Sequence, residues 1–299
     1  MSAVEGTTIE ERDDALSFDE ELPELSDRVT TIRPAARLPH LDLRELWQYR
    51  ELAATFAWRD LKVRYKQSLI GAAWAILQPV MTMVVFTFIF GTFAHVPSQG
   101  LPYPVFSYSG ILPWIYFSSA LGAASGSLAM NSTLVTKIYF PRLLLPLAAV
   151  TVPAVDFLLA TTVLGGLMGY YSLSTGIHAL LAPLFMILAA ASALGVGLVF
   201  AVINVRYRDV PYAIPFIIQI WLFLSPVIYP IRALKQPWER LILSLNPMSG
   251  VITGFRWSLL GTSPPTPLQI VLSIVAAAAF LAFGLAVFRR SEPRFADTI

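Results

Sequence analysis

Four basic residues that lie close together, Arg59, Lys62, Arg64 and Lys66, are the clearest candidates for ligand chemistry in this sequence. Guanidinium and ammonium groups donate charge-assisted hydrogen bonds to phosphate oxygens, so the cluster could bind a compact polyanion such as a diphosphate. The same residues could instead fix the orientation of a membrane protein and attract anionic lipid. Arg59 and Arg64 project about 140° apart on an ideal helix, so they cannot grip one phosphate group unless the helix breaks between them.

Side chains that could perform catalysis are sparse elsewhere. The chain has no cysteine, its histidines are scattered at His40, His95 and His178, and no GxxxxGK[ST] string is present to cradle nucleotide phosphates. We therefore predict no metal site, no catalytic residue, no resident cofactor and no ATP hydrolysis by this chain. Asp156 is the one acid inside an expected membrane helix, where a structural hydrogen bond or a protonated carboxyl is favoured over substrate coupling.

The composition indicates a protein that lies in lipid. Of 299 residues, 56% are hydrophobic and 13% are charged, and no Lys, Arg, Asp or Glu occurs between Lys66 and Lys137. That uncharged stretch holds two spans of about 20 residues each. The sequence predicts an all-α membrane protein with six transmembrane helices, near Leu69–Phe93, Val105–Leu128, Leu144–Tyr170, Ile177–Ile203, Pro211–Ile231 and Leu268–Phe288.

The N-terminal part differs from the rest in charge. Residues 1–41 are rich in acids and then in proline, which predicts a disordered cytoplasmic tail. A helix is expected to begin at the capping residue Asp42, and residues 42–68 form an amphipathic helix in the membrane interface rather than a helix of a soluble domain. Residues 69–290 form the six-helix domain and 291–299 a cytoplasmic C-terminal tail. The polar stripe of the interfacial helix consists of Arg44, Gln48, Glu51, Thr55, Arg59, Lys62 and Lys66.

The distribution of basic residues predicts that both termini are cytoplasmic. Lys137, Arg142, Arg206 and the arginines near residue 290 then lie inside, as the positive-inside rule requires. Only the last outer segment, 232–266, departs from the rule. It is also unusually apolar for a loop, so we expect two short helices there, broken at Asn246–Pro247, which lie at the outer interface or re-enter the membrane.

The small residues and the aromatic residues within the spans each allow two structural interpretations. The small-residue run Gly122–Gly126 is expected to pack helices together rather than to act as a hinge. Aromatic rings could form an interfacial belt, or they could line a pore and stack on the apolar faces of sugars. The rings considered for the pore are Phe86, Phe90, Trp114, Tyr116, Trp221 and Tyr229.

Four ordered strings resemble the permeases of type-2 ABC exporters for O-antigen and teichoic acid. They are RDLKVRYKQSLIGAAWAILQPVMTMVVFTFIFG (Arg59–Gly91), KIYFPRLLLP (Lys137–Pro146), NVRYRDVPYAIPFIIQIWLFLSPVIYP (Asn204–Pro230) and LNPMSGVITGFRWSLLG (Leu245–Gly261). The resemblance covers about Leu43–Arg290 and does not extend to the acidic N-terminal segment.

This resemblance implies a homodimer in the plasma (inner) membrane, each copy bound to a separate ATPase subunit that supplies ATP and magnesium. The exported substrate would be a polysaccharide or teichoic acid on a polyprenyl diphosphate carrier, whose diphosphate the basic cluster would recruit. The implied contacts with the ATPase fall on the interfacial helix and on Asn131, Lys137, Tyr139 and Arg142. The implied outer gate falls on Trp238, Asn246, Pro247 and Phe255.

Two other classes share some of these features. A type-2 exporter of drugs or small lipids would have the same topology. A membrane-bound glycolipid enzyme would need catalytic acids on its loops, and the sequence contains no such pair.

Overall fold

The computed structural model describes residues 43–66, 71–207 and 209–295, and within these ranges every regular element is helical. The predicted N-terminal tail, the capping residue Asp42 and Arg208 lie outside the described residues. The elements, in chain order, are α1 (Leu43–Gln48), α2 (Arg50–Lys66), α3 (Ala73–Phe86), the π-helix η1 (Thr87–Phe93), α4 (Tyr103–Met130), α5 (Ser132–Lys137), α6 (Leu144–Tyr170), η2 (Ile177–Leu181), α7 (Ala182–Arg206), α8 (Val210–Phe223), η3 (Ile231–Ala233), α9 (Pro237–Ser244), α10 (Pro247–Leu260), α11 (Pro267–Ser291) and η4 (Glu292–Arg294).

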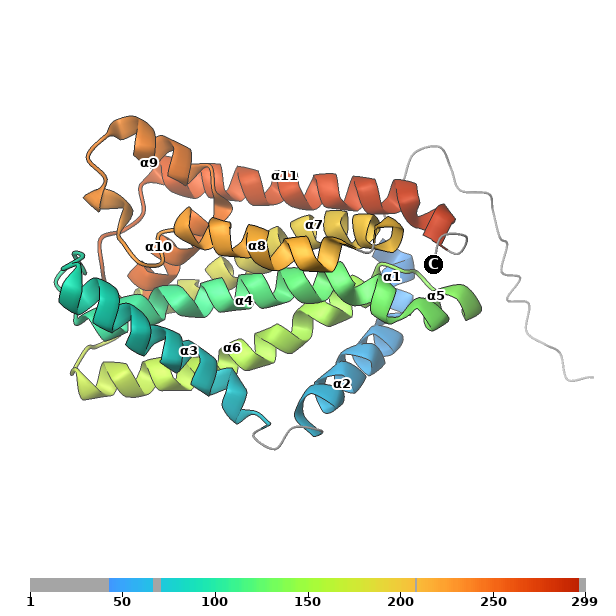
Figure 1. Ribbon diagram of the computed structural model, residues 1–299, viewed down its shortest axis with the longest axis horizontal. Coiled ribbons are helices and arrows are strands. Elements are labelled where there is room, and N and C mark those ends of the chain that lie inside the picture. The colour runs from blue at the N-terminus through green and yellow to red at the C-terminus, as the bar shows by residue number, and fades with distance from the viewer. Residues whose placement is uncertain (1–42, 67–70, 208, 296–299) are drawn as a thin grey trace, which may run out of the picture. The chain divides into compact units, whose positions relative to one another are not determined.

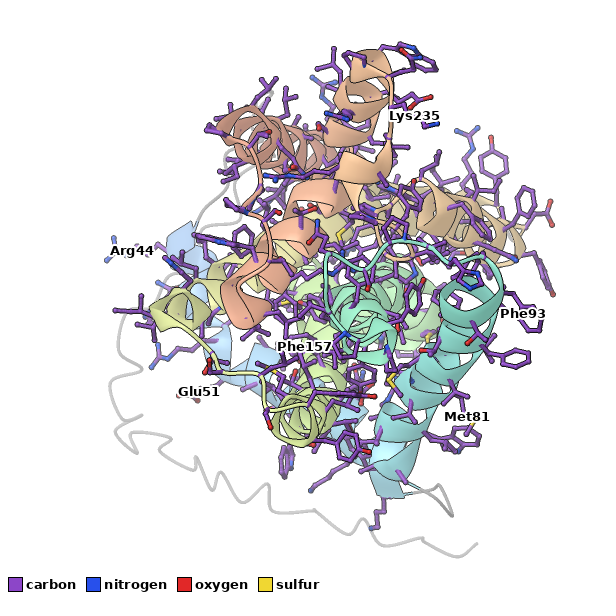
Figure 2. The ribbon with its side chains drawn as sticks, turned by 90° about the vertical axis from the view of Figure 1, so that its left-hand side faces the viewer. Arg44, Glu51, Met81, Phe93, Phe157 and Lys235 are labelled. Carbon is purple, nitrogen blue, oxygen red and sulfur yellow. The ribbon has the colours of Figure 1, made fainter. Side chains whose placement is uncertain are left out.

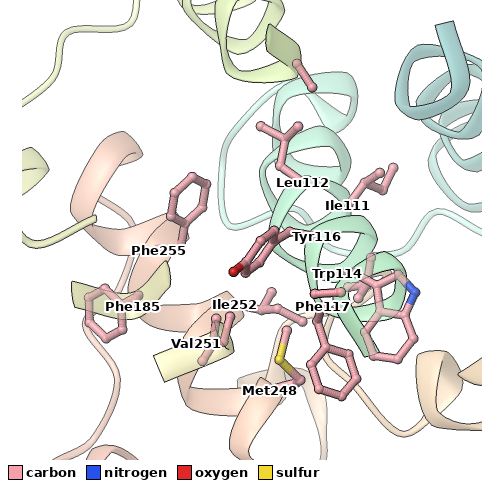
Figure 3. Packing of buried hydrophobic residues seen from close by; sticks show 14 of the residues in the cluster. Ile111, Leu112, Trp114, Tyr116, Phe117, Phe185, Met248, Val251, Ile252 and Phe255 are labelled. Carbon is pink, nitrogen blue, oxygen red and sulfur yellow. The ribbon is translucent and has the colours of Figure 1, made fainter. Parts of the chain in front are cut away.

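Helix α4 forms the centre of the helix bundle. It packs against α6, α7, α10 and α3, while α11 packs against α7 (Figure 1). Its apolar side chains are enclosed by α10 and α7, as the grouping of Phe117, Met248, Val251 and Ile252 makes clear (Figure 3). Buried serines of α4 donate hydrogen bonds to carbonyl oxygens of the preceding turn, for example Ser127 Oγ to Ala124 O at 2.7 Å. Such bonds let hydroxyl groups lie inside an apolar bundle without unpaired polar atoms.

Four helical segments of the described chain are long and apolar enough to cross a membrane, namely Ala73–Phe93, Leu144–Tyr170, Ile177–Arg206 and Pro267–Ser291. These coincide with four of the predicted spans. The second predicted span corresponds to α4, whose 28 residues include several serines and an internal proline and which is not among the four. The chain is therefore an integral membrane protein, and its regular elements are helical throughout the described residues.

The fifth predicted span is wrong as a continuous helix. We expected it to run to about Ile231, but α8 ends at Phe223 after 14 residues. A helix of that length rises about 21 Å, less than the hydrocarbon thickness of about 30 Å. The chain turns after α8 because Asn246 Nδ2 donates to Leu224 O at 2.9 Å and Ser225 Oγ donates to Trp221 O at 2.9 Å, which satisfies carbonyls at the end of the helix.

The N-terminal helical segment is also interrupted, at Tyr49, where one uninterrupted helix was predicted. Its second part, α2, packs on α6. A separate apolar cluster joins Phe56 of α2 to Phe140, Phe288 and Phe295. Because Phe295 is only 2% exposed, the segment just after α11 packs against the helices as far as this residue.

Close helix crossings depend on glycines other than those predicted. A Cβ atom at Gly284 of α11 would lie 2.1 Å from the carbonyl oxygen of Gly195 of α7, and one at Gly197 would lie 2.6 Å from Ala124 Cβ. Gly122 and Gly126 make no such approach: a Cβ at Gly122 meets nothing within 4 Å, and one at Gly126 meets only Met130 Sδ, at 3.5 Å. The helix packing predicted for the run Gly122–Gly126 is therefore made by Ala124, whereas Gly122 and Gly126 themselves border open space.

Candidate functional site

The open space beside Gly122 is a groove of about 390 Å³ between α4 and α8, called the α4/α8 groove below. Its lining residues are Ser118, Ser119, Gly122, Ser125 and Gly126 of α4, Asn204 of α7, and Pro211, Ile214, Pro215 and Ile218 of α8. Small and hydroxyl side chains form one wall, and apolar side chains form the other. Pro211 belongs to the first turn of α8, where a missing backbone N–H is tolerated best, and Pro215 lies inside the helix.

The hydroxyl wall of the α4/α8 groove presents hydrogen-bond acceptors. Ser118 Oγ donates to Ile115 O at 3.0 Å and Ser125 Oγ donates to Gly122 O at 2.7 Å, so the proton of each hydroxyl is already used. The lone pairs of both oxygens remain free to accept. The amide of Asn204 donates to Ser125 O at 3.1 Å and holds α7 against this wall. A ligand rich in hydroxyl donors would match such a surface.

A second polar site joins α2 to α6. Arg64 Nη2 lies 2.5 Å from Asp156 Oδ2, and Tyr65 Oη donates to Asp156 Oδ1 at 2.5 Å. Burial, and then the hydrogen bond to Asp156, raises the pKa of Tyr65 above its ordinary value, so the phenol stays protonated and donates. The structural hydrogen bond that we favoured for Asp156 is present, with an ion pair in addition.

The structure divides the basic cluster into residues that face the bundle and residues that face away from it. Arg59 donates to Asp60 Oδ1 at 2.8 Å and to Asn131 Oδ1 at 2.8 Å, and Arg64 is paired as described above. Lys62 and Lys66 are exposed and take part in none of the ion pairs found among the described residues. Diphosphate recruitment by this cluster stays a prediction, with the two lysines as its available cations.

The six aromatic rings considered for a pore lie within the helix packing of one subunit. Trp114 and Tyr116 are about 5% and 6% exposed, respectively. Trp221 Nε1 donates to Asn246 Oδ1 at 3.0 Å, and Tyr229 Oη donates to Phe223 O at 3.0 Å. The rings of Phe86 and Phe90 contact each other edge to face, with centroids 5.5 Å apart. None of the six lines the described α4/α8 groove, so their contact with a sugar stays a prediction.

The four residues predicted to contact an ATPase fall into two pairs. Asn131 accepts from Arg59 of α2, and Arg142 donates its backbone N–H to Glu292 Oε1 at 3.2 Å, so both hold the bundle together. Lys137 and Tyr139 are exposed, Tyr139 by 77%. The α5–α6 connection therefore presents an exposed tip on a braced base, at the same end of the bundle as α1 and the end of α11 (Figure 1).

The residues predicted as an outer gate lie around α9 and α10. Trp238 of α9 is 61% exposed, whereas Phe255 of α10 is 2% exposed and packs against Phe157 with ring centroids 5.7 Å apart. Asn246 precedes Pro247 and caps α10, with its Oδ1 accepting from Met248 N at 3.0 Å. Because Asn246 also bonds to Trp221 and Leu224, it links α10 to the end of α8.

Comparison with known proteins decides the family. The family model described as ABC-2 type transporter matches residues 51–260, which is more than half of the chain. The chain belongs to the ABC-2 type transporter family.

Curated relatives match over most of their own length. The O-antigen export system permease protein RfbA of Myxococcus xanthus is 29% identical over 259 residues, which cover 86% of this chain and 98% of that protein. A protein of the same name from Klebsiella pneumoniae is 25% identical over 242 residues, 81% of this chain and 92% of that protein. The polysialic acid transport protein KpsM of Escherichia coli is 23% identical over 243 residues, 78% of this chain and 91% of that protein.

Sequence reasoning missed the α4/α8 groove and the partners of Asp156. The signal for the groove was present, because Ser118, Ser119, Gly122, Ser125 and Gly126 are all small residues within three turns of α4. Their meaning depended on whether a neighbouring helix covers them. No spacing relates Asp156 to Arg64, since the two meet only through the crossing of α2 and α6.

Proposed function

We propose that this chain is the channel-forming subunit of an ATP-driven exporter that moves a polysaccharide, linked to polyprenyl diphosphate, across the plasma membrane. The names of its relatives carry this proposal, since they describe permease or transport proteins for O-antigen and polysialic acid that match over most of their length. The polymer is of the O-antigen or teichoic-acid type. ATP and magnesium act in a separate ATPase subunit, because this chain contains no GxxxxGK[ST] string.

The α4/α8 groove supports a path for a hydroxyl-rich substrate. Against hydrocarbon, the hydroxyl oxygens of Ser118 and Ser125 would find no donor for their free lone pairs, whereas a hydroxyl-rich substrate would supply one. A second copy of the chain facing the groove would cover it and enclose a channel wall with serine acceptors. The exporter is accordingly a homodimer, with the channel between its copies.

Substitution at Gly122 tests this path. Gly122→Leu fills the groove, and because no atom lies within 4 Å of the added Cβ, it leaves the fold intact. Gly166→Leu is the matched control, since a Cβ at this position of α6 also meets nothing within 4 Å but lies outside the groove. Gly122→Leu should abolish surface polysaccharide in cells that lack the native gene, measured by antibody labelling, and Gly166→Leu should restore it. Normal surface polysaccharide with Gly122→Leu would exclude this channel path.

Gene deletion tests the transport role itself. Cells without this chain should accumulate lipid-linked polysaccharide inside and show none at the surface. Unchanged surface polysaccharide would refute export by this protein, whichever residues line the path.

The exposed tip between α5 and α6 is the proposed contact with the ATPase subunit. Tyr139→Ala should weaken copurification of the ATPase, whereas Tyr170→Ala removes a ring that is 81% exposed near the other end of α6 and should not. Equal copurification with both variants would exclude the tip as the contact.

The proposed topology has six spans, with α4 as the second and α8 together with the segment that follows it as the fifth, both termini in the cytoplasm, and α9 and α10 as short outer helices. The chain has no native cysteine, so single cysteines report on it directly. Ser98→Cys should react with an impermeant thiol reagent added outside intact cells, and Ser132→Cys should not. The reverse result would invert the topology.

A further inference from the structure

A second cavity, of about 370 Å³, shares no lining residue with the α4/α8 groove and lies where η3, α9 and the α10–α11 connection meet. Its size falls at the lower end of small-ligand pockets, which span roughly 300–1,000 Å³. Arg232, Arg240 and Arg256 all line it, so we call it the arginine cavity. No Asp or Glu is among its described lining residues. The helix α9 and the nearby Lys235 project from this end of the bundle (Figure 2).

None of the three arginines belongs to an ion pair among the described residues. Arg232 Nη2 donates to Pro264 O at 3.2 Å, and Arg240 donates twice to Leu234 O, at 2.9 and 2.6 Å. The first contact holds Arg232 against the connection between α10 and α11, and the other two hold Arg240 against the segment between η3 and α9. These contacts do not neutralise the charge, and each group keeps further N–H donors.

Arg256 is buried, with 2% of its surface exposed. It donates to Ser109 Oγ at 3.2 Å, to Pro226 O at 3.3 Å and to Val227 O at 3.1 Å, and its guanidinium lies 3.8 Å from the centroid of the Phe106 ring. A guanidinium has five N–H donors, so two are not used by these bonds. A buried cation without a counter-ion is costly, and an anion in the adjoining cavity would offset that cost.

An unpartnered hydroxyl provides an independent indication of a ligand. Thr262 lines the arginine cavity and is 9% exposed, and its Oγ1 is buried without a hydrogen-bond partner among the described residues. It follows Gly261, whose φ of +63° makes the sharp turn out of α10. Buried hydroxyl groups are nearly always hydrogen-bonded, so an unpaired one beside three cations points to an absent acceptor.

We propose that the arginine cavity binds a phosphate or diphosphate group. Arginine forks match phosphate oxygens in charge and geometry, and the Thr262 hydroxyl would donate to a further oxygen. Ser244, Ser263 and Thr266 also line the cavity, so hydroxyl groups attached to the phosphate find partners there. The assignment goes beyond polysaccharide export, because it names a ligand site at the end of the bundle away from the basic cluster of α2.

The first experiment titrates inorganic pyrophosphate into the purified full chain in a phosphate-free maltoside detergent, with calorimetry as the readout. Arg232→Gln and Arg240→Gln should each weaken binding about tenfold, through the loss of one charge-assisted contact. Lys235→Gln is the matched control, because it removes the same charge from the same exposed segment but does not line the cavity. Equal weakening by all three variants, or no binding by the native chain, would overturn the proposal.

Two variants examine the floor of the cavity. Arg256→Lys keeps the charge but loses the fork, and Thr262→Val loses only the hydroxyl, so both should weaken pyrophosphate binding while Thr262→Val keeps the melting temperature of the native chain. If Arg256→Lys does not fold, the affinity of Thr262→Val for pyrophosphate still tests the proposed site. Native affinity in Thr262→Val would exclude its hydroxyl from the site.

Phosphate could reach the cavity from a phospholipid headgroup or from the linkage of the exported glycan. Glycerol 3-phosphate and N-acetylglucosamine 1-phosphate, titrated separately, distinguish these sources. Tighter binding of the sugar phosphate identifies the glycan linkage, and tighter binding of glycerol 3-phosphate identifies lipid. If neither compound binds and pyrophosphate does not bind either, the proposed site is overturned. This outcome does not test export, which is measured independently through surface polysaccharide.

Discussion

At the junction of α2 and α6, the buried carboxylate of Asp156 receives an ion pair from Arg64 and a hydrogen bond from Tyr65. In α10, by contrast, the buried guanidinium of Arg256 is surrounded by two carbonyl oxygens, a hydroxyl and an aromatic ring. In the first site, the negative charge of Asp156 is neutralised by the positive charge of Arg64. The second holds a cation whose described neighbours supply no opposite charge. The comparison separates a charge that braces two helices from a charge that remains available to an anion.

The largest effect is expected from Arg256→Leu. This change removes three hydrogen bonds and leaves the carbonyl oxygens of Pro226 and Val227 without their donor, which should cost about 3 kcal/mol of unfolding free energy. The melting temperature of the purified chain should fall markedly. Arg232→Leu, an exposed counterpart in the same cavity, should change the unfolding free energy by less than about 0.5 kcal/mol. Equal melting temperatures of the two variants would contradict the structural role of Arg256.

Arg64→Met should have the next largest effect, because it leaves Asp156 buried with Tyr65 as its single polar partner. The side chain of Asp156 is 12% exposed and that of Arg64 is 49% exposed. We therefore expect a loss of about 2 kcal/mol, below the range for a fully buried pair. Asp156→Asn should cost less, since Arg64 can turn to water and the amide oxygen still accepts from Tyr65. A greater loss from Asp156→Asn than from Arg64→Met would reverse this account of the junction.

Tyr65→Phe removes one hydrogen bond from the same junction and keeps the ion pair. The unfolding free energy should fall by about 1 kcal/mol, the usual contribution of a single hydrogen bond. A double-mutant cycle with Asp156→Ala, which removes the acceptor, gives the direct measurement, through the melting temperatures of the four proteins. Strict additivity of the two changes would indicate that Tyr65 and Asp156 do not interact.

Lys62→Gln is expected to have the smallest effect. Its ammonium lies 5.5 Å from the centroid of the Trp58 ring and is exposed, so the change in unfolding free energy should stay below about 0.5 kcal/mol. The melting temperature should match that of the native chain. A loss as large as that of Arg64→Met would show that the exposed and paired parts of the basic cluster are not distinct.

The sequence predicted the membrane helices whose apolar length is sufficient by itself. The third span was placed at Leu144–Tyr170, and α6 has these bounds, because about 20 consecutive apolar residues identify a span without any knowledge of its neighbours. The break between α9 and α10 was likewise expected at Asn246–Pro247, where Asn246 caps α10. The family also followed from the sequence, since its four strings are fixed in order along the chain.

Contacts between residues far apart in the sequence decided the end of α8, the roles of the glycines and the pairing of the buried charges. Apolar length predicted that α8 would continue to Ile231, but it ends at Phe223, where Asn246 donates to Leu224 O and accepts from Trp221 Nε1. The same limit explains the glycines: small residues permit either close packing or an open groove, and only the position of the neighbouring helix distinguishes Gly195 from Gly122. Hydrophobic length and capping are properties of a short segment, so the sequence by itself determines them. The pairing of Asp156 with Arg64, and the absence of any such partner for Arg256 among the described residues, depend on how helices cross, which tertiary packing alone decides.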